Sequence, residues 1–483
     1  MVKYTCTKCG KLFNQKGHYQ RHMKRKYSCT DDENLFKSIK DELFSIKSDL
    51  KSLIDSTKGG GEKVEGVEEI RYIDLCCGIG GFRVGINAFK NPKYSFKCVY
   101  SADIKEDAIK TYNINFNESM GKHDIYNITN KDIPPFDMLC AGFPCQPFSS
   151  AGAKKGFKDK RGGMIFKIVE LCKAYKPKIV ILENVYNLLT LEKGEVISKI
   201  CDLFHDLDYN ISYKKLNSVD FGVPQSRERV YIVATLDKEV DLETIKYQLM
   251  NTLSVAIEGD EKYNDFEKSF TDKLLKLHED KPIYGYKLQD KRGGSKNIHS
   301  WDIGYNGETT VDERALISKL MTERRKKKWA TKKGIVWMDG MPLTYDEIAS
   351  FYDHPDLKEM LDHLVEMKYL KLEKCKDLVG GKRVYKEDSE PGYNICKGKL
   401  SFPISKILDP DDIAPTLTAT DSSKLVFIID NKYIRRLTNN ELKRICGFPD
   451  NFIIPAGVNQ YDLFGNMVTP PVITKLLDCI FSE

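Results

Sequence analysis

The positions of apolar residues in the first half of the chain predict a series of buried strands. Short apolar runs bounded by glycine, proline or charged residues are typical of strands that are covered on both faces. The predicted strands cover residues 70–75, 98–104, 136–141, 179–182 and 230–235. Helical patterns follow the first strand, through Phe89, and begin again near Met164. This alternation predicts an α/β protein with an open parallel sheet.

A different pattern precedes these strands. Apolar residues spaced alternately by three and four predict a helix with one apolar seam. The seam consists of Phe36, Ile39, Leu43, Ile46, Leu50 and Leu53. It either packs on the rest of the same protein or forms a weak homodimer contact through residues 36–53. Three glycines at 59–61 predict a flexible linker and place a domain boundary near residue 66.

From residue 240 to 432 the pattern is irregular and polar, which predicts a second domain. Within it, residues 356–372 predict a helix followed by a strand, and with residues 382–386 they could form a winged-helix insert. A basic cluster at 324–328 is a candidate contact for phosphate groups. Helical patterns return in the last fifty residues.

Composition limits the classes of protein that fit this pattern. With 483 residues, of which 41% are apolar and 30% charged, the chain can form two or three globular units. It has no apolar run near the ~18 residues that span a membrane, and its first residues are too basic for a signal peptide. We therefore expect an intracellular, soluble protein, in the cytoplasm or nucleus, without membrane partners. A net charge of +6 is compatible with nucleic acid binding without requiring it.

The first 29 residues carry eight Lys or Arg and no Asp or Glu. The candidate zinc ligands among them are Cys6, Cys9, His22 and Cys29. Three thiolates and one imidazole could close a tetrahedral site, which a segment with so small a core would need. Residues 1–30 resemble a C2H2-type zinc finger in which a cysteine replaces the last histidine, and His18 is an alternative ligand. A basic finger would contact nucleic acid phosphates, and a protein-binding finger is the alternative.

Candidate catalytic residues lie at the ends of the predicted strands. Cys145, in the sequence GFPCQPFS, follows the third strand, where open parallel sheets place reacting groups. Glu183, in the sequence Glu-Asn-Val, ends the fourth strand. Arg227 and Arg229 stand at i and i+2 before the fifth strand, so both would project from one face of an extended chain. A carboxylate at the end of one strand, beside a candidate nucleophile at the end of another, is typical of an active site.

A glycine-rich turn follows the first strand in the sequence DLCCGIGG, residues 74–81, and Asp103 ends the second strand. Glycine lets the backbone approach a ligand, and a carboxylate in this position could accept hydrogen bonds from ribose hydroxyls. The third glycine of the dinucleotide-binding fingerprint is absent, so phosphate binding is the weaker interpretation.

Together these segments resemble the motifs of the DNA (cytosine-5-)-methyltransferases, in the order that the family has them. GFPCQPFS is similar to the Pro-Cys-Gln motif, and the Glu-Asn-Val and Arg-x-Arg segments match its partners. Residues 435–441 and 465–472 match the last motifs, so the resemblance spans about 70–235 and 433–480. It implies a doubly wound, Rossmann-like methyltransferase sheet, a smaller target-recognition domain, and S-adenosylmethionine as the cofactor.

The resemblance also implies cofactor-binding residues and domain limits. The implied cofactor-binding residues are Asp74, Gly78, Gly80, Asp103, Asp124, Ile125, Pro144, Asn466 and Val468. The implied domains are a zinc finger at 1–30, a helix and linker at 31–66, a catalytic domain at 67–239, a target-recognition domain at 240–432 and a closing segment at 433–483. Cys76 stands where the family usually has phenylalanine.

The candidate residues could perform the reaction that the resemblance implies. Carbon 5 of cytosine is a poor nucleophile, so Cys145 would first add to carbon 6 of a base flipped out of double-stranded DNA. Glu183 would hold ring N3, while Arg227 and Arg229 would favour the thiolate and orient the ring.

Two alternative functions remain. One is a tRNA cytosine-5 methyltransferase, but the Cys-Phe-Thr motif of that branch is absent. The other is a catalytically silent DNA-binding protein, against which the intact Cys145 and Glu183 argue. The residues do not decide between a role in restriction-modification and a role in regulation.

Overall fold

The computed structural model describes most of the chain after residue 65. The described residues are 4–5, 12–13, 66–129, 131–143, 163–290, 293–336, 338, 340–396 and 402–482. Contacts divide the chain into two compact units, Met1–Val67 and Glu68–Glu483. In the first unit, β1 (Tyr4–Thr5) pairs antiparallel with β2 (Leu12–Phe13). The predicted helix at 36–53 lies outside the described residues.

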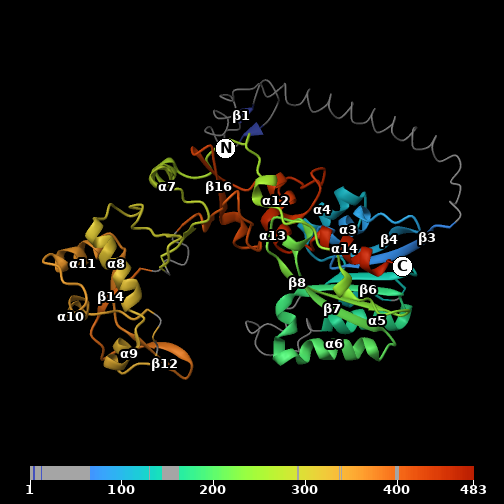
Figure 1. Ribbon diagram of the computed structural model, residues 1–483, viewed down its shortest axis with the longest axis horizontal. Coiled ribbons are helices and arrows are strands. Elements are labelled where there is room, and N and C mark those ends of the chain that lie inside the picture. The colour runs from blue at the N-terminus through green and yellow to red at the C-terminus, as the bar shows by residue number, and fades with distance from the viewer. Residues whose placement is uncertain are drawn as a thin grey trace. The chain divides into compact units, whose positions relative to one another are not determined.

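The second unit contains a six-stranded sheet with the order β4-β3-β5-β6-β8-β7 (Figure 1). Its strands are β3 (Glu68–Leu75), β4 (Tyr94–Ala102), β5 (Met138–Gly142), β6 (Ile179–Val185), β7 (Asn210–Asn217) and β8 (Glu228–Thr235). The first four strands of this order are parallel, and β8 runs antiparallel to both of its neighbours. The predicted α/β class is confirmed. Because β8 is antiparallel, its first residues lie at the same edge of the sheet as the last residues of β6.

Helices cover both faces of this sheet, because successive side chains of a strand point to opposite faces. On β3, Ile73 and Leu75 pack in one core with α5 (Gly163–Tyr175) and α6 (Glu195–His205). Tyr72, on the opposite face, packs in another core with α3 (Gly81–Ala88) and α14 (Pro470–Ile480). The chain's last helix therefore completes the core that β3 and α3 begin.

Two glycines of α3 let α14 approach closely. A Cβ at Gly81 would collide with the carbonyl oxygen of Val468, and one at Gly85 would lie 2.6 Å from the carbonyl oxygen of Pro470. The hydroxyl of Thr474 donates to the Gly85 carbonyl at 2.9 Å. Helix α4 (Glu106–Phe116) follows β4, and part of it packs with the segments around residues 442–467.

A second sheet, with the order β10-β9-β15-β16-β17, follows in the sequence. Its strands are β9 (Lys287–Leu288), β10 (Asn297–Ile298), β15 (Lys406–Ile407), β16 (Leu425–Ile429) and β17 (Tyr433–Arg436). Helix α7 (Lys268–Asp280) packs in the same core, through Phe270 and Leu274. Short 3-10 helices connect elements at 125–127, 186–189, 191–194, 218–221, 242–244, 253–255 and 422–424.

Residues 299–396 lie between β10 and β15 and have a core of their own. Their helices are α8 (Val311–Glu323), α9 (Lys327–Lys333), α10 (Tyr345–Ala349) and α11 (Leu357–Glu366). Their strands are β11 (Leu370–Glu373), β12 (Lys376–Val379), β13 (Lys382–Tyr385) and β14 (Gly392–Ile395). Strand β14 pairs with β11 and is also joined by a single bridge from Tyr393 to Leu343, which precedes α10. This order, with the β12–β13 hairpin between β11 and β14, is that of a winged helix. The predicted helix and strand at 356–372 are present as α11 and β11.

The predicted phosphate contact at 324–328 needs correction at its first residue. Arg324 is fully buried, and its Nη1 atom donates to Oδ1 of Asn394 at 2.5 Å. Trp329, which follows the cluster, is also buried. The run of basic residues in the sequence could not show this burial, because Asn394 lies 70 residues away.

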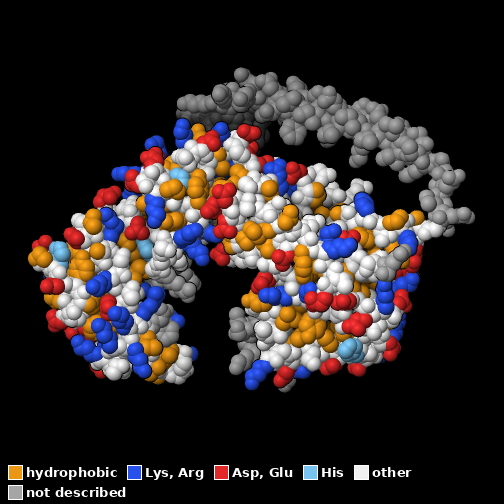
Figure 2. Space-filling view, viewed as in Figure 1, with side chains coloured by type: hydrophobic (Ala, Val, Ile, Leu, Met, Phe, Trp, Pro, Cys, Tyr) orange, Lys and Arg blue, Asp and Glu red, His pale blue; other side chains and the backbone are white. Residues whose placement is uncertain are grey.

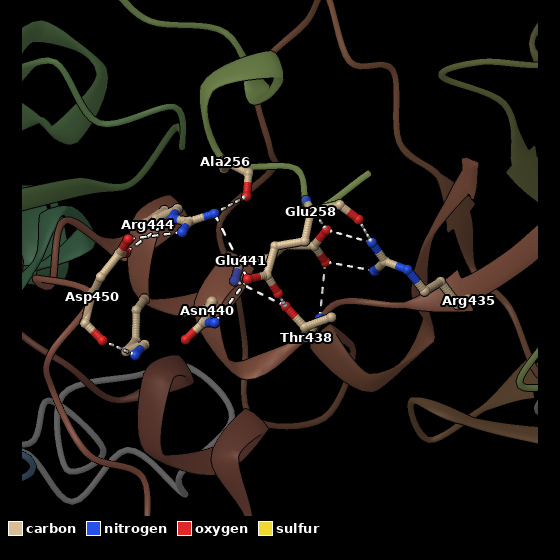
Figure 3. Close-up of polar contacts among 9 residues, drawn as sticks. Ala256, Glu258, Arg435, Thr438, Asn440, Glu441, Arg444 and Asp450 are labelled. Carbon is tan, nitrogen blue, oxygen red and sulfur yellow. Dashed lines mark hydrogen bonds and ion pairs between the residues drawn. The ribbon is translucent and has the colours of Figure 1, made fainter. Parts of the chain in front are cut away.

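Strand β17 of the second sheet is tied to α12 (Asn439–Cys446) by a buried ion pair (Figure 3). The Arg435 guanidinium donates to both carboxylate oxygens of Glu441, at 2.7 and 2.8 Å, and both side chains are fully buried. Glu441 also accepts the backbone amides of Thr438 and Glu258. The N-cap of α12 is therefore Thr438, which forms a capping box with Glu441. Helix α13 (Gln460–Gly465) follows.

Candidate active site

The glycine-rich turn after β3 has the conformation that its sequence predicts. Gly78 and Gly80 have φ values of 55° and 88°, in the left-handed region that glycine adopts without strain. The amide of Gly78 donates to Oδ2 of Asp103 at 2.8 Å, so the turn is fastened to the end of β4. A Cβ added at Gly78 would meet no atom within 4 Å, which leaves open space beside the turn.

Asp103 is held between two segments of the predicted cofactor site. Its Oδ1 atom accepts the amide of Lys105 at 2.8 Å, and its carbonyl accepts the amide of His123 at 3.0 Å. The second bond places Asp124 and Ile125 near the end of β4. Each carboxylate oxygen has a further lone pair, so the backbone bonds leave Asp103 able to accept from a ligand.

Asp124 and Ile125 differ in exposure. Asp124 is exposed and its Oδ1 atom caps a 3-10 turn by accepting the amide of Tyr126 at 3.1 Å. Ile125 is buried in the core. Two apolar neighbours that we did not single out from the sequence are exposed instead, namely Ile104 (54%) and Tyr126 (39%). Their position directly beside Asp103 and Ile125 was the available signal.

Asp74 lies in the interior rather than at an open surface. Its side chain is fully buried, and neither carboxylate oxygen has a hydrogen-bond partner among the described residues. Burial raises the pKa of Asp74 to about 8, Arg83 opposes that shift, and the charge of Asp103 adds to it. Cys76, which stands where the family usually has phenylalanine, directs its thiol to the sulfur of Met164 at 3.3 Å.

The segment 465–468 closes one side of the turn. Asn466 donates from its side-chain amide to the carbonyl of Asp462, and Asp462 forms an ion pair with Lys105 at 3.0 Å. Val468 packs against Gly81, and a Cβ at Gly142 would lie 3.4 Å from its Cγ2 atom. The structure thus brings the glycine turn and the residues after 465 to the end of β5.

Glu183 lies at the centre of the carboxyl edge of the sheet. It pairs with Gly142 of β5 on one side and with Tyr231 of β8 on the other. Its side chain is almost fully buried, and its Oε1 atom lies 3.0 Å from Nε of Arg229. A Cβ at Gly142 would lie 3.8 Å from Oε2, so that oxygen is directed toward the end of β5.

Burial raises the pKa of Glu183, and the positive charges of Arg229 and Arg227 limit the increase. The net result is a carboxyl group that keeps its proton to a higher pH than an exposed glutamate would. This property suits an acid that must donate a hydrogen bond near neutral pH.

Asn184, the next residue of β6, supports the same edge. Its side-chain amide donates to the carbonyl oxygen of Phe143 at 2.9 Å, and both residues are buried. We did not single out Asn184 from the sequence beyond its place in the Glu-Asn-Val segment. The bond fixes the last described residue before Pro144.

Arg227 and Arg229 have separate surroundings. Arg227 is buried and donates to three carbonyl oxygens, those of Leu417, Gly465 and Met467. Burial and the charge of Arg229 lower its pKa to about 10. Arg229 instead reaches Glu183. The alternation of a strand would put both side chains on one face, but β8 begins only at Glu228.

Comparison with known proteins identifies the arrangement. The sequence profile of the C-5 cytosine-specific DNA methylases matches residues 70–482. The chain belongs to this family. Its relatives include the type II methyltransferases M.NlaIV of Neisseria lactamica (43% identical) and M.NgoBV of Neisseria gonorrhoeae (42%), each aligned over 84% of this chain and 97% of the relative. M.BanI of Aneurinibacillus aneurinilyticus is 35% identical over 86% of this chain and 96% of the relative.

The family match confirms the prediction of a DNA (cytosine-5-)-methyltransferase, an enzyme that uses S-adenosylmethionine and acts on DNA. Several predicted residues of this methylase lie outside the described part of the chain. They are the catalytic candidate Cys145, the cofactor candidate Pro144, and the zinc candidates Cys6, Cys9, His22 and Cys29. Among the described residues there is no cluster of side chains that could hold a metal ion, and no helix that is long and apolar enough to cross a membrane.

Proposed function

We propose that this methylase modifies cytosine through a covalent bond between Cys145 and carbon 6, and that Glu183 and Arg229 complete the catalytic site. The observation that carries this proposal is the buried Glu183 carboxyl group, which lies beside Gly142 and is held by Arg229 at 3.0 Å. Cys145 follows Phe143 by two residues, so its Cα atom is at most ~7 Å from that of Phe143. The Asn184 bond to the Phe143 carbonyl supports the same assignment.

The proton of Glu183 belongs on Oε2, because Arg229 occupies Oε1. A protonated Oε2 would donate to ring N3 of a flipped cytosine and so draw electrons from carbon 6. The Cys145 thiolate then attacks carbon 6, and carbon 5 becomes an enamine-like nucleophile. When bound, S-adenosylmethionine supplies an electrophilic methyl group. Loss of the carbon 5 proton and departure of the thiolate restore the aromatic ring.

The described residues fit the cofactor. Asp103 would accept hydrogen bonds from the ribose hydroxyls, and Asp124 would accept the adenine amino group. Ile104 and Tyr126 are exposed apolar groups beside these acids and would cover the faces of the adenine ring. The open space beside Gly78 suits the amino-acid end of the cofactor. Asp74, which is buried, would act on this site through the turn rather than by contact.

We also propose the role of a modification enzyme in type II restriction-modification, because the relatives are type II methyltransferases over most of both chains. The target DNA is double-stranded, and residues 240–432 would recognise its sequence. The basic residues 1–30 would form a zinc finger that contacts phosphates, held by Cys6, Cys9, His22 and Cys29. Residues 36–53 would provide a weak homodimer contact.

Trapping with a modified base tests the proposed chemistry. Fluorine at carbon 5 cannot leave as a proton does, so a duplex with 5-fluorocytosine should trap the wild type as a covalent complex in the presence of S-adenosylmethionine. The Cys145→Ser variant should bind the same duplex but should form no covalent complex with it. A covalent complex with the Ser variant would refute the assignment of the nucleophile. Bisulfite sequencing of a random DNA library would then give the methylated sequence.

A further inference from the structure

The hairpin β12–β13 projects from the winged-helix segment 299–396. Its strands pair from Lys376 with Tyr385 to Val379 with Lys382, and two glycines make the turn between them. Gly380 and Gly381 both have positive φ values, 58° and 78°, as a two-residue type I′ turn requires. A Cβ at either glycine would meet no atom within 4 Å, so the tip is open.

Both faces of the hairpin are exposed. One face carries Leu378 with its partner Arg383, and the other carries Val379 with its partner Lys382. Exposed fractions are 38% for Leu378, 64% for Val379 and 48% for Val384, and both cations are exposed as well. A two-stranded ribbon with apolar side chains on both faces is not stable by itself in water, and such exposure marks a contact surface.

The root of the hairpin, in contrast, is fixed. The Lys386 ammonium donates to the carbonyl oxygen of Lys333 at the end of α9, at 3.0 Å. The amide of Val336 donates to Oδ1 of Asp377 at 2.8 Å. The carboxylate within the two strands is thereby turned toward the root, and the outer part of the ribbon carries only positive charge.

Charged side chains of both signs surround the root. A hollow of about 160 Å³ between the hairpin and β11 is lined by Lys371, Lys374, Lys376 and Arg383, together with Glu373. Lys371 is paired with Glu373 at 2.8 Å and Lys374 with Glu387 at 3.0 Å, whereas Lys376 lies over the ring of Tyr385. Figure 2 shows basic and apolar side chains over the elements that Figure 1 labels α9 and β12.

Helix α11 carries the opposite charge, although its place in the fold is that of a winged helix's reading helix. Its exposed residues include Glu359, Asp362 and Glu366. The one exposed lysine of the helix, Lys358, is paired with Asp362 at 2.5 Å. This face would repel a phosphate backbone, so the charge distribution favours the hairpin as the DNA contact.

We propose that the β12–β13 hairpin enters the major groove of the DNA target and reads part of its sequence. The proposal rests on the function proposed above, since it names the element that contacts the substrate. The major groove of B-DNA, ~12 Å wide, admits a two-stranded β-ribbon. Arg383 and Lys382 donate to guanine edges or phosphates, and Leu378 and Val379 contact thymine methyl groups. Duplex DNA offers phosphates and guanine edges to the two cations and thymine methyl groups to the two apolar side chains.

The test compares Lys382→Ala/Arg383→Ala with a matched control, Lys358→Ala on α11. Binding to the preferred duplex, defined by the wild type's methylation pattern, and to an unrelated duplex is measured by fluorescence anisotropy at several salt concentrations. We expect the double variant to bind the preferred duplex ~10-fold or more weakly, with a smaller loss on the unrelated duplex and a shallower salt dependence. The control should bind both duplexes as the wild type does.

Unchanged affinity in the double variant, or an equal loss on both duplexes, would overturn the assignment of the hairpin to groove reading. Affinity for S-adenosylmethionine serves as the measure of an intact fold, and it should stay unchanged. Leu378→Ser/Val379→Ser provides an independent variant that keeps all charges and should also reduce the preference for the target. If the wild type methylates no DNA, the proposed function fails, while the binding comparison with a guanine-containing duplex still decides the role of the hairpin.

Discussion

The Nε atom of Arg229 lies 3.0 Å from Oε1 of Glu183, and the two residues come from neighbouring antiparallel strands. The guanidinium therefore stabilises one carboxylate oxygen while the other, Oε2, remains directed toward Gly142. Burial raises the pKa of Glu183, and Arg229 limits that increase. This pair sets the pH range in which Glu183 holds a proton.

Replacing Arg229 should change the pH dependence of catalysis. Without its positive charge the pKa of Glu183 rises further, so the protonated form persists to higher pH. In Arg229→Ala we expect a lower maximal rate and an alkaline limb of the rate profile that shifts to higher pH. Rates measured in single-turnover reactions across a series of buffers would show the shift.

Glu183→Gln serves as the comparison for that experiment. Glutamine keeps the shape but cannot exchange the proton, so the rate should fall by ~10²–10⁴ while duplex binding is kept. The alkaline limb that belongs to Glu183 should disappear. A limb that persists unchanged in this variant would assign the pH dependence to another group.

Arg227 should matter for stability more than for chemistry. Its guanidinium donates to carbonyl oxygens of Leu417, Gly465 and Met467, and Arg227→Met would leave these buried acceptors without a donor. We expect the free energy of unfolding to fall by about 2–4 kcal/mol. Urea titrations would measure this change. Arg229→Ala is the control, because Arg229 is joined to Glu183 rather than to these carbonyls, and an equal loss there would contradict the distinction.

Asp74 should make the stability of the protein decrease with pH. Its pKa is about 8 in the folded protein and 3.8 without the fold, so between these values the folded state holds a proton that the unfolded chain has released. Stability from this group is complete below pH 3.8 and is lost as the pH rises toward about 8, at ~1.4 kcal/mol per pH unit. Asp74→Asn should remove this dependence.

Urea titrations at several pH values would compare Asp74→Asn with the wild type. The two curves should diverge as the pH rises, with the variant relatively more stable at pH 8 than at pH 5. Parallel curves would mean that Asp74 is not protonated in the folded protein.

Deletion of residues 1–66 should remove zinc and weaken engagement with DNA. The predicted ligands lie in this segment, and the described residues contain no other group of metal-ligating side chains. We expect a higher DNA concentration for half-maximal rate, most visibly at high salt, and an unchanged methylated sequence. Metal analysis of the truncated protein should find almost no zinc. Stoichiometric zinc after the deletion, or a new target sequence, would show that the ligands or the role were misassigned.

Local sequence patterns were sufficient to place the residues that lie at the end of a buried strand. Glu183 and Asp103 lie at the carboxyl edge of the sheet because buried parallel strands are recognisable by composition. The strand β7 was not predicted, since its residues are mostly polar and only partly buried. The separate roles of Arg227 and Arg229 depend on carbonyls 190 to 240 residues away, which no local pattern contains.

The contact of α14 with α3 has a consequence for the time at which the enzyme becomes active. The hydrogen bond from Thr474 to Gly85 joins residues that are 389 positions apart. At a translation rate of ~5–20 residues per second, about 20–80 s separate the synthesis of these two partners. During that interval the nascent chain lacks α14, which packs with α3 on one face of the six-stranded sheet. Methylation therefore begins only after nearly the whole protein has left the ribosome, and a premature stop codon late in the gene would abolish it.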